Sequence, residues 1–501
     1  MNKQIKLGAI LSYLNILAKN IVNFIYTPFL LRFVGQANYG LFQMTNSVIL
    51  SLSLLSMGFS SAYVKFYMRY KVDNDNESIH KLNGIYGLLF LGISLLSLII
   101  GSVLVVNTGR IFGGKLTLNQ VELMRKLMIV LVLDVSVTFI STIFDSNITV
   151  NEQFIFQQSR QLIQTFLVPL ICIPMVLLGT GVLSIVITQI SVTTLFLVLN
   201  VNYCIRKLGM KFKFKNLPVS LLKGLLGFSF FIFLNQIVDL INNNVPNFIL
   251  GIFQGAKMVA TFSIAVQIKN MFFMLSTSLS GMFIPKINKL VSLKATKAEL
   301  TNLMIKVGRI QMSLLFFVLG GFIVVGRYFI QLWAGNENSE AYGLIILMVL
   351  PSIVPLSQNV GIEIQKAMNK HIFRSITYFV FAILNILITV IGAIYWGLFG
   401  AAIGYVMSIV LANGVLMNWY YYKYIGLDIK RYWKETSTAM IPFLITSFLL
   451  GGLEILYPII NIGMFFLFGC IYTGVYGFIY FKYVANRFEK QMLGGLKKRY
   501  E

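Results

Sequence analysis

Apolar runs long enough to cross a bilayer, separated by short polar segments, recur along almost the whole chain. A membrane-spanning helix needs about 20 apolar residues, so 501 residues without a long polar insertion accommodate about fourteen of them. The spans that we predict lie near residues 7–31, 40–64, 84–106, 125–148, 161–180, 182–205, 221–250, 258–284, 306–333, 342–366, 375–396, 398–422, 438–457 and 461–483. The pattern therefore predicts an all-α integral membrane protein.

The first predicted span carries polar residues on one face. Asn15, Lys19 and Asn23 follow one another at intervals of four residues, which stacks their side chains along a helix. A cation at the centre of a spanning helix costs roughly 2.5 to 3.5 kcal/mol on insertion scales. We therefore expect this face to line a cavity inside the protein.

Four further spans carry polar side chains within apolar sequence. They are Asp134, Thr138, Ser141 and Asp145; Asn235, Asp239, Asn242 and Asn243; Gln267, Lys269 and Asn270; and Gln358, Asn359 and Glu363. Polar groups have no favourable place against lipid, so these spans predict a hydrated cleft. Our candidates for substrate binding are Lys19, Lys269, Asn15, Asn23, Asn235, Asp239 and Asn270, and those for a coupling H⁺ or Na⁺ are Asp134, Asp239 and Glu363.

The role of Lys19 has two interpretations. Its ammonium group is a point charge suited to an anionic phosphate headgroup, and Lys269 is a second candidate for that contact. Alternatively, Lys19 forms a structural ion pair with Asp239, because charges buried in a membrane usually pair. The sequence leaves both open.

A weak internal repeat relates the two halves of the chain at an offset of 220 residues. Each copy holds an even number of predicted helices, so both copies cross the membrane in the same sense, and a substrate site is expected between them. We thus predict six-helix lobes at residues 1–218 and 219–437, and two additional helices with a basic tail at 438–501. The matched positions are Asn15 with Asn235, Asn23 with Asn243, Gly35 with Gly255, Phe42 with Phe262, and Lys19 opposite Asp239.

The composition is that of a membrane protein, and this changes how the positive net charge is interpreted. Hydrophobic residues make up 57% of the chain, charged residues make up 12%, and the mean hydropathy is +0.79. A net charge of +24 would indicate nucleic acid in a soluble protein. Here most Lys and Arg residues fall in alternate connections, which the positive-inside rule assigns to the cytoplasm together with both termini. The charge therefore indicates contact with anionic membrane lipids and no nucleic-acid partner.

Features of an enzyme or a metal site are missing from the sequence. The two histidines, His80 and His371, fall in predicted loops, and three scattered cysteines do not suggest a disulfide framework or a thiolate metal site. The G-x-x-x-x-G-K-[ST] motif of ATPases does not occur. We expect a non-enzymatic protein with no cofactor other than a coupling H⁺ or Na⁺.

Residues 27–44 read TPFLLRFVGQANYGLFQM. This stretch resembles the opening signature of the Wzx-type polysaccharide-export flippases, in the superfamily of multidrug, oligosaccharidyl-lipid and polysaccharide (MOP) exporters. The likeness continues in GFSSAYVKFY, NQIVDLINNNVPNFILGIFQGAKMVATFSIA and GMFIPKINKL, and it covers essentially the whole chain. The positions that carry the opening signature are Pro28, Leu31, Arg32, Gly35, Tyr39 and Gly40.

The resemblance implies a flippase for undecaprenyl-pyrophosphate-linked oligosaccharide repeat units. Such a protein works by alternating access in the bacterial cytoplasmic (inner) membrane and serves O-antigen, capsule or exopolysaccharide assembly. Cavity cations, here Lys19 and Lys269, would hold the pyrophosphate, and a polysaccharide polymerase and chain-length machinery would be partners. The membrane potential would favour the outward movement of the negatively charged carrier.

Three alternatives stay open. A lipid II flippase shares the substrate chemistry and differs mainly in the sugar. A cation-coupled multidrug exporter of the same superfamily should have an acidic, aromatic-lined cavity. A membrane glycan polymerase or ligase needs an outer catalytic loop larger than any that we predict here.

Overall fold

The computed structural model describes residues 3–56, 58–217 and 236–491, together with 224, 225, 229 and 233, and this part of the chain contains helices and no β-strand. The predicted all-α fold is therefore confirmed. The α-helices are α1 (Lys3–Val34), α2 (Gln36–Leu52), α3 (Phe59–Val72), α4 (Asn76–Phe112), α5 (Leu118–Val150), α6 (Phe154–Met175), α7 (Leu183–Asn202), α9 (Val245–Phe253), α10 (Ala256–Gly281), α11 (Ile284–Ser292), α12 (Lys297–Ala334), α13 (Ala341–Ser357), α14 (Asn359–Ala367), α15 (Ile372–Ser408), α16 (Asn418–Tyr420), α17 (Ile429–Thr436), α18 (Met440–Leu456) and α19 (Ile462–Ile479).

Among the described residues, 11 helices are long and apolar enough to cross a membrane, or 12 if α13 and α14 form one broken span bent by 43°. Part of the span expected at residues 221–250 lies outside the described residues. The protein is thus a multi-pass membrane protein, while the count of about fourteen spans stays a prediction.

One helical stretch, Ile372–Ile425, is 54 residues long and folds back on itself at Gly397. Gly397 has φ 57° and ψ −131°, a conformation that favours glycine. The two arms pack closely, because a Cβ atom on Gly392 would overlap the carbonyl group of Gly400 and Ser408 donates a hydrogen bond to the carbonyl oxygen of Phe381 at 2.9 Å. The hairpin has two helical arms where the sequence predicts two spans, at residues 375–396 and 398–422.

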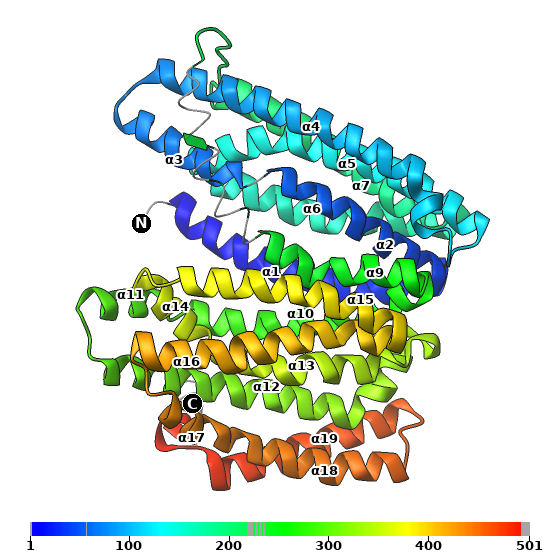
Figure 1. Cartoon of the computed structure of the whole chain (residues 1–501), viewed down its shortest axis with the longest axis vertical. Coiled ribbons are helices and arrows are strands. Elements are labelled where there is room, and N and C mark those ends of the chain that lie inside the picture. The colour runs from blue at the N-terminus through cyan, green and yellow to red at the C-terminus, as the bar shows by residue number, and fades with distance from the viewer. Residues whose placement is uncertain are drawn as a thin grey trace. The chain divides into compact units, whose positions relative to one another are not determined.

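The chain divides into two packing units, Met1–Ala260 and Thr261–Glu501. In the first unit, α5 packs against α4 and α7, and α6 packs against α1 and α7 (Figure 1). Helix α9 belongs to this unit because it packs on α2, where the Asn247 amide donates to Ser47 Oγ at 3.2 Å. In the second unit, α12 packs against α13, α17, α18 and α19. The lobe boundaries expected near residues 218 and 437 stay predictions.

The order and starting points of helices recur between the two halves. Helices α2 and α10 start 220 residues apart, each directly after a glycine with positive φ, namely Gly35 (φ 87°) and Gly255 (φ 85°). Asn74 and Lys294, also 220 residues apart, both have positive φ and precede the long helices α4 and α12. The backbone thus repeats at the offset that the sequence predicts.

Candidate functional site

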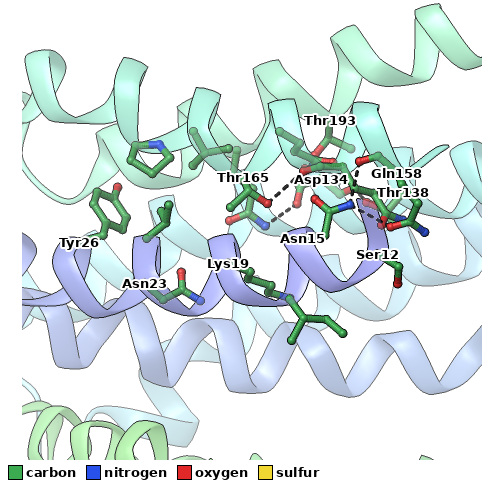
Figure 2. A pocket seen from close by; sticks show the side chains of 17 residues that line it. Ser12, Asn15, Lys19, Asn23, Tyr26, Asp134, Thr138, Gln158, Thr165 and Thr193 are labelled. Atoms are coloured by element: carbon green, nitrogen blue, oxygen red, sulfur yellow. Dashed lines mark hydrogen bonds between the residues drawn. The ribbon is translucent and has the colours of Figure 1, made fainter. Parts of the chain in front are cut away.

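A polar cavity of about 640 Å³ lies within the first unit, lined by α1, α5, α6 and α7 (Figure 2). Its described lining is dominated by side-chain amides and hydroxyl groups. The amides are those of Asn15, Asn23, Gln158, Gln161, Gln164 and Gln189; the hydroxyl groups are those of Ser12, Tyr26, Thr138, Thr165 and Thr193; the charged groups are Lys19 and Asp134. We refer to this site as the polar cavity.

Helix α1 presents the predicted polar face to the polar cavity. Asn15, Lys19 and Asn23 all line it. The Asn15 amide donates to the backbone oxygen of Gln158 at 2.7 Å and to Gln158 Oε1 at 2.8 Å, and these bonds hold α1 against α6. Asn15 is only 9% exposed, and its Oδ1 atom has no hydrogen-bond partner in the described part of the chain. This buried acceptor could be satisfied by a ligand in the cavity.

Asp134 supplies the negative charge of the polar cavity from α5. Its side chain is 4% exposed, and its Oδ2 atom accepts a hydrogen bond from Gln189 Nε2 at 2.8 Å. The Oδ1 atom lacks a hydrogen-bond partner among the described residues. Figure 2 shows Asn15, Gln158, Thr138, Asp134 and Thr193 gathered at one end, with Asn23 and Tyr26 further along α1.

Lys19 lies in the lining with an exposed side chain. No carboxylate lies within ion-pair distance, 4.0 Å, of its ammonium group in the described ranges. The alternative ion pair with Asp239 is thus not formed in this structure, where Asp239 is an exposed residue of a separate helical segment. The Lys19 ammonium group can therefore meet an anionic group in the polar cavity.

Lys269 and Asn270 lie on α10 in the second unit and are not among the described lining residues of the polar cavity. Lys269 is 2% exposed, and its Nζ atom lies 4.4 Å from the ring centroid of Tyr405 and 5.8 Å from that of Phe273. Both distances are within the range of cation–π attraction. Asn270 is exposed. Lys269 thus packs against aromatic rings within the second unit, whereas Lys19 lines a cavity of the first unit.

The other predicted candidates are not among the described lining residues of the polar cavity. Glu363, on α14, forms an ion pair with Lys366 at 2.7 Å, one helical turn further along. Asn235 lies outside the described residues. Of the three candidates for a coupling ion, Asp134 is the one that the described lining includes. No group of three or more His, Cys, Asp and Glu side chains that could hold a metal ion occurs in the ranges that the structure describes.

The contribution of α6 and α7 was not predicted from the sequence. Gln158, Gln161 and Thr165 are spaced three and four residues apart, the same signal that identified α1, but they lie at the start of a predicted span that otherwise reads as apolar. Arg160 lies near the start of α6, where it is 9% exposed and forms an ion pair with Asp145 at 2.7 Å.

A protein-family model described as "Polysaccharide biosynthesis protein" matches residues 5–291, which is more than half of the chain. The chain belongs to this family. The matched region contains the whole described lining of the polar cavity, which runs from Ser12 to Thr193. No curated protein sequence gives a significant match.

Solved structures show which fold this member of the polysaccharide biosynthesis family adopts. It is similar to the lipid II flippase MurJ in its inward closed conformation, with a TM-score of 0.70 and 14% identity over 95% of this chain and 99% of MurJ. It is also similar to an inward-facing multidrug resistance MATE family transporter of the MOP superfamily, with a TM-score of 0.58 and 17% identity over 84% of this chain and 95% of that one. For a mutant form of the Vibrio cholerae MATE transporter VcmN, the TM-score is 0.54 and the identity 12%, over 85% of this chain and 98% of that one. The protein therefore has the fold of these flippase and transporter structures.

Proposed function

We propose that this protein moves oligosaccharide repeat units linked to undecaprenyl pyrophosphate from the inner to the outer leaflet of the bacterial cytoplasmic membrane. The movement proceeds by alternating access, with both termini in the cytoplasm, and supplies O-antigen, capsule or exopolysaccharide assembly. No covalent bond is made or broken in this step. A polysaccharide polymerase and chain-length machinery are the partners that would use the product.

The polar cavity is the observation that carries the proposal. Its volume of about 640 Å³ is typical of sites for organic ligands. Six amide side chains inside a bundle of apolar helices offer both donors and acceptors, which is the chemistry that binds sugar hydroxyl groups. Lys19 adds one cation for a phosphate oxygen. Together with membership of a polysaccharide biosynthesis family, this lining supports a glycolipid as substrate.

The lining argues against a cationic drug. A site for cations should combine several acidic groups with aromatic rings, whereas the described lining has one acid, Asp134, and one aromatic ring, that of Tyr26. A lipid II flippase is the nearer alternative because its substrate has the same pyrophosphate and a different sugar. The fold likeness to MurJ does not decide between them.

Two sources of energy suit this movement. Carrying two negative charges outward through 100 mV, with the cell interior negative, is favoured by about 4.6 kcal/mol. Asp134 is our candidate for a coupling H⁺ or Na⁺, because its buried Oδ1 atom has no hydrogen-bond partner in the described part of the chain. The transport assay below, run with and without an ion gradient, compares the two sources.

The proposal is tested with purified protein in liposomes that contain a fluorescent undecaprenyl-pyrophosphate disaccharide. Access of an impermeant quencher measures its transfer between leaflets. We expect Lys19→Ala to slow transfer about tenfold, because a hydrogen bond to a charged group contributes about 1.5 to 3 kcal/mol. Lys430→Ala, at an exposed lysine of α17, is the matched control and should transfer at the normal rate. Transfer no faster than in protein-free liposomes, or uptake of a cationic dye in its place, would contradict the proposal.

A further inference from the structure

We infer that the polar cavity selects an uncharged sugar directly next to the pyrophosphate, and that the α6 amides Gln161 and Gln164 bind its hydroxyl groups. The inference rests on the proposed function and names the substrate class of the same site. Three features of the first unit carry it: the amides of α6, the level of Lys19 along the cavity, and the balance of charge in the lining.

The amides of α6 form a row with unused hydrogen-bonding capacity. Gln158 accepts bonds from Asn15, but the side chains of Gln161 and Gln164 make no hydrogen bond to any residue in the described ranges. Each of these two carboxamides offers two donor hydrogens and one acceptor oxygen. Neighbouring hydroxyl groups of a sugar ring are donors and acceptors in the same way, so this wall of the polar cavity matches a neutral sugar.

Lys19 lies at the same level as the first of these amides. Helices α1 and α6 run in the same direction, because the N–H of Ile155 donates to Gln4 Oε1 at 3.2 Å near their starts and Asn15 bonds Gln158 further along. One turn beyond that contact, α1 presents Lys19 and α6 presents Gln161. A phosphate held by Lys19 therefore places the attached sugar against the amides of α6.

The charge of the lining disfavours an acidic sugar at this position. The described lining holds one cation, Lys19, and one carboxylate, Asp134, so no cation is left over once Lys19 contacts phosphate. The lining atoms Asn15 Oδ1 and Asp134 Oδ1, which are buried without a hydrogen-bond partner in the described part, are both acceptors. Hydroxyl groups supply the donors that these atoms need, whereas a sugar carboxylate brings further acceptors and a like charge. A site built for hydroxyl donors rejects a ligand that leaves its polar groups unpaired.

The test measures binding to the intact protein in nanodiscs with three probes. They are undecaprenyl pyrophosphate without sugar, the same lipid carrying two N-acetylglucosamine residues, and the same lipid with glucuronic acid as the first sugar. We expect the neutral glycolipid to bind at least tenfold more tightly than either of the other two. In the variant Gln161→Leu/Gln164→Leu, this advantage should disappear while binding of the sugar-free lipid is unchanged. Gln331→Leu, a partly exposed glutamine of α12 outside the described lining, is the matched control.

Two results would overturn the inference. One is equal binding of the neutral and acidic glycolipids to the unmodified protein. This result does not depend on whether any variant folds. The other is a loss of affinity for all three probes alike in the double glutamine variant, which would place these amides at the pyrophosphate. Sugar-dependent binding without any transfer in the liposome assay would instead contradict the proposed function and leave the sugar site standing.

Discussion

At the scale of single residues, the ion pair of Arg160 with Asp145 joins α5 to α6 beside the polar cavity. Their side chains are 9% and 30% exposed and lie 2.7 Å apart. Asn200 donates to Asp145 Oδ1 at 3.1 Å, Ser141 donates to Oδ2 at 3.3 Å, and the guanidinium lies 5.9 Å from the Phe196 ring centroid. Arg160 therefore stabilises the packing of α5, α6 and α7 in the first unit.

We predict that Asp145→Ala destabilises the protein strongly. Removing one partner of a buried pair costs roughly 3 to 5 kcal/mol because the other charge stays buried, and the partial exposure of Asp145 places this variant at the low end. Thermal unfolding in detergent measures the change. The control is Glu122→Gln, which breaks the 2.7 Å pair with Lys126 where both side chains are more than half exposed and should cost less than about 1 kcal/mol. Equal losses in the two variants would show that the Arg160 pair is no different from a surface pair.

The residues also show what sequence could and could not predict about the site. Spacing by four identified Asn15, Lys19 and Asn23 as one face, and the structure brings them together with Asp134. The same reasoning could not separate Lys19 from Lys269, since both a cavity and a packed aromatic pocket shield a cation from lipid. Only tertiary structure reveals the ring of Tyr405 at 4.4 Å from Lys269. The ion pair between Asp145 of α5 and Arg160 of α6 was not predicted. Hydropathy defines helix ends poorly, so it could not show that a basic residue near the start of α6 is buried.

At the scale of elements, backbone carbonyl groups at the break between α13 and α14 accept hydrogen bonds from side chains of neighbouring helices. The bend of 43° follows Pro355, which has no N–H to donate. The bend leaves carbonyl groups at the end of α13 without hydrogen-bond partners in the helix. Ser276 Oγ donates to the Leu356 oxygen at 2.6 Å, and the Tyr432 hydroxyl group donates to the Ser357 oxygen at 2.9 Å. Helix α17, which carries Tyr432, is thereby fixed to the broken span.

We predict that Gly308→Ala weakens this contact. A Cβ atom at Gly308 would lie 2.8 Å from the Tyr432 hydroxyl oxygen and 2.9 Å from the Ser357 oxygen, so α12 and α17 would have to move apart. Overpacking of this kind costs about 1 to 3 kcal/mol. The melting temperature in detergent should fall accordingly. Gly452→Ala on α18, where a Cβ atom meets nothing within 4 Å, should not lower it, and a Gly308→Ala protein as stable as that control would refute the prediction.

Hydropathy predicted most spanning elements, since apolar length is what a bilayer requires. It could not predict that α4 and α12 run to 37 and 38 residues, or that the broken span bends at Gln358, because these features depend on packing between helices and not on lipid. The stretch around Gly397 was predicted as two spans because its apolar length exceeds one bilayer crossing, whereas the reversal at Gly397 itself is seen only in the structure.

At the scale of the whole molecule, the repeated backbone predicts a specific membrane topology. Asn74 and Lys294 precede the long helices α4 and α12, while Gly114 and Asn336 follow them, and all four positions are exposed. Helix α4 is 37 residues, roughly 55 Å at 1.5 Å per residue, so its ends lie on opposite sides of a hydrocarbon core of about 30 Å. Even numbers of spans in each half would place Asn74 and Lys294 on one side and Gly114 and Asn336 on the other.

We predict that single cysteines at these positions will label in that pattern. In a background where the three native cysteines are replaced by alanine, Gly114→Cys and Asn336→Cys should react with a membrane-impermeant maleimide on intact cells. Asn74→Cys and Lys294→Cys should react only after the cells are permeabilised, because the basic residues near them favour the cytoplasm. If the pair in the second half labelled in the reverse sense to the pair in the first, the repeat would be inverted in the membrane. If both pairs were reversed, the parallel repeat would stand, but the termini would lie outside, and the proposed direction of glycolipid movement would have to be reconsidered against the positive-inside rule.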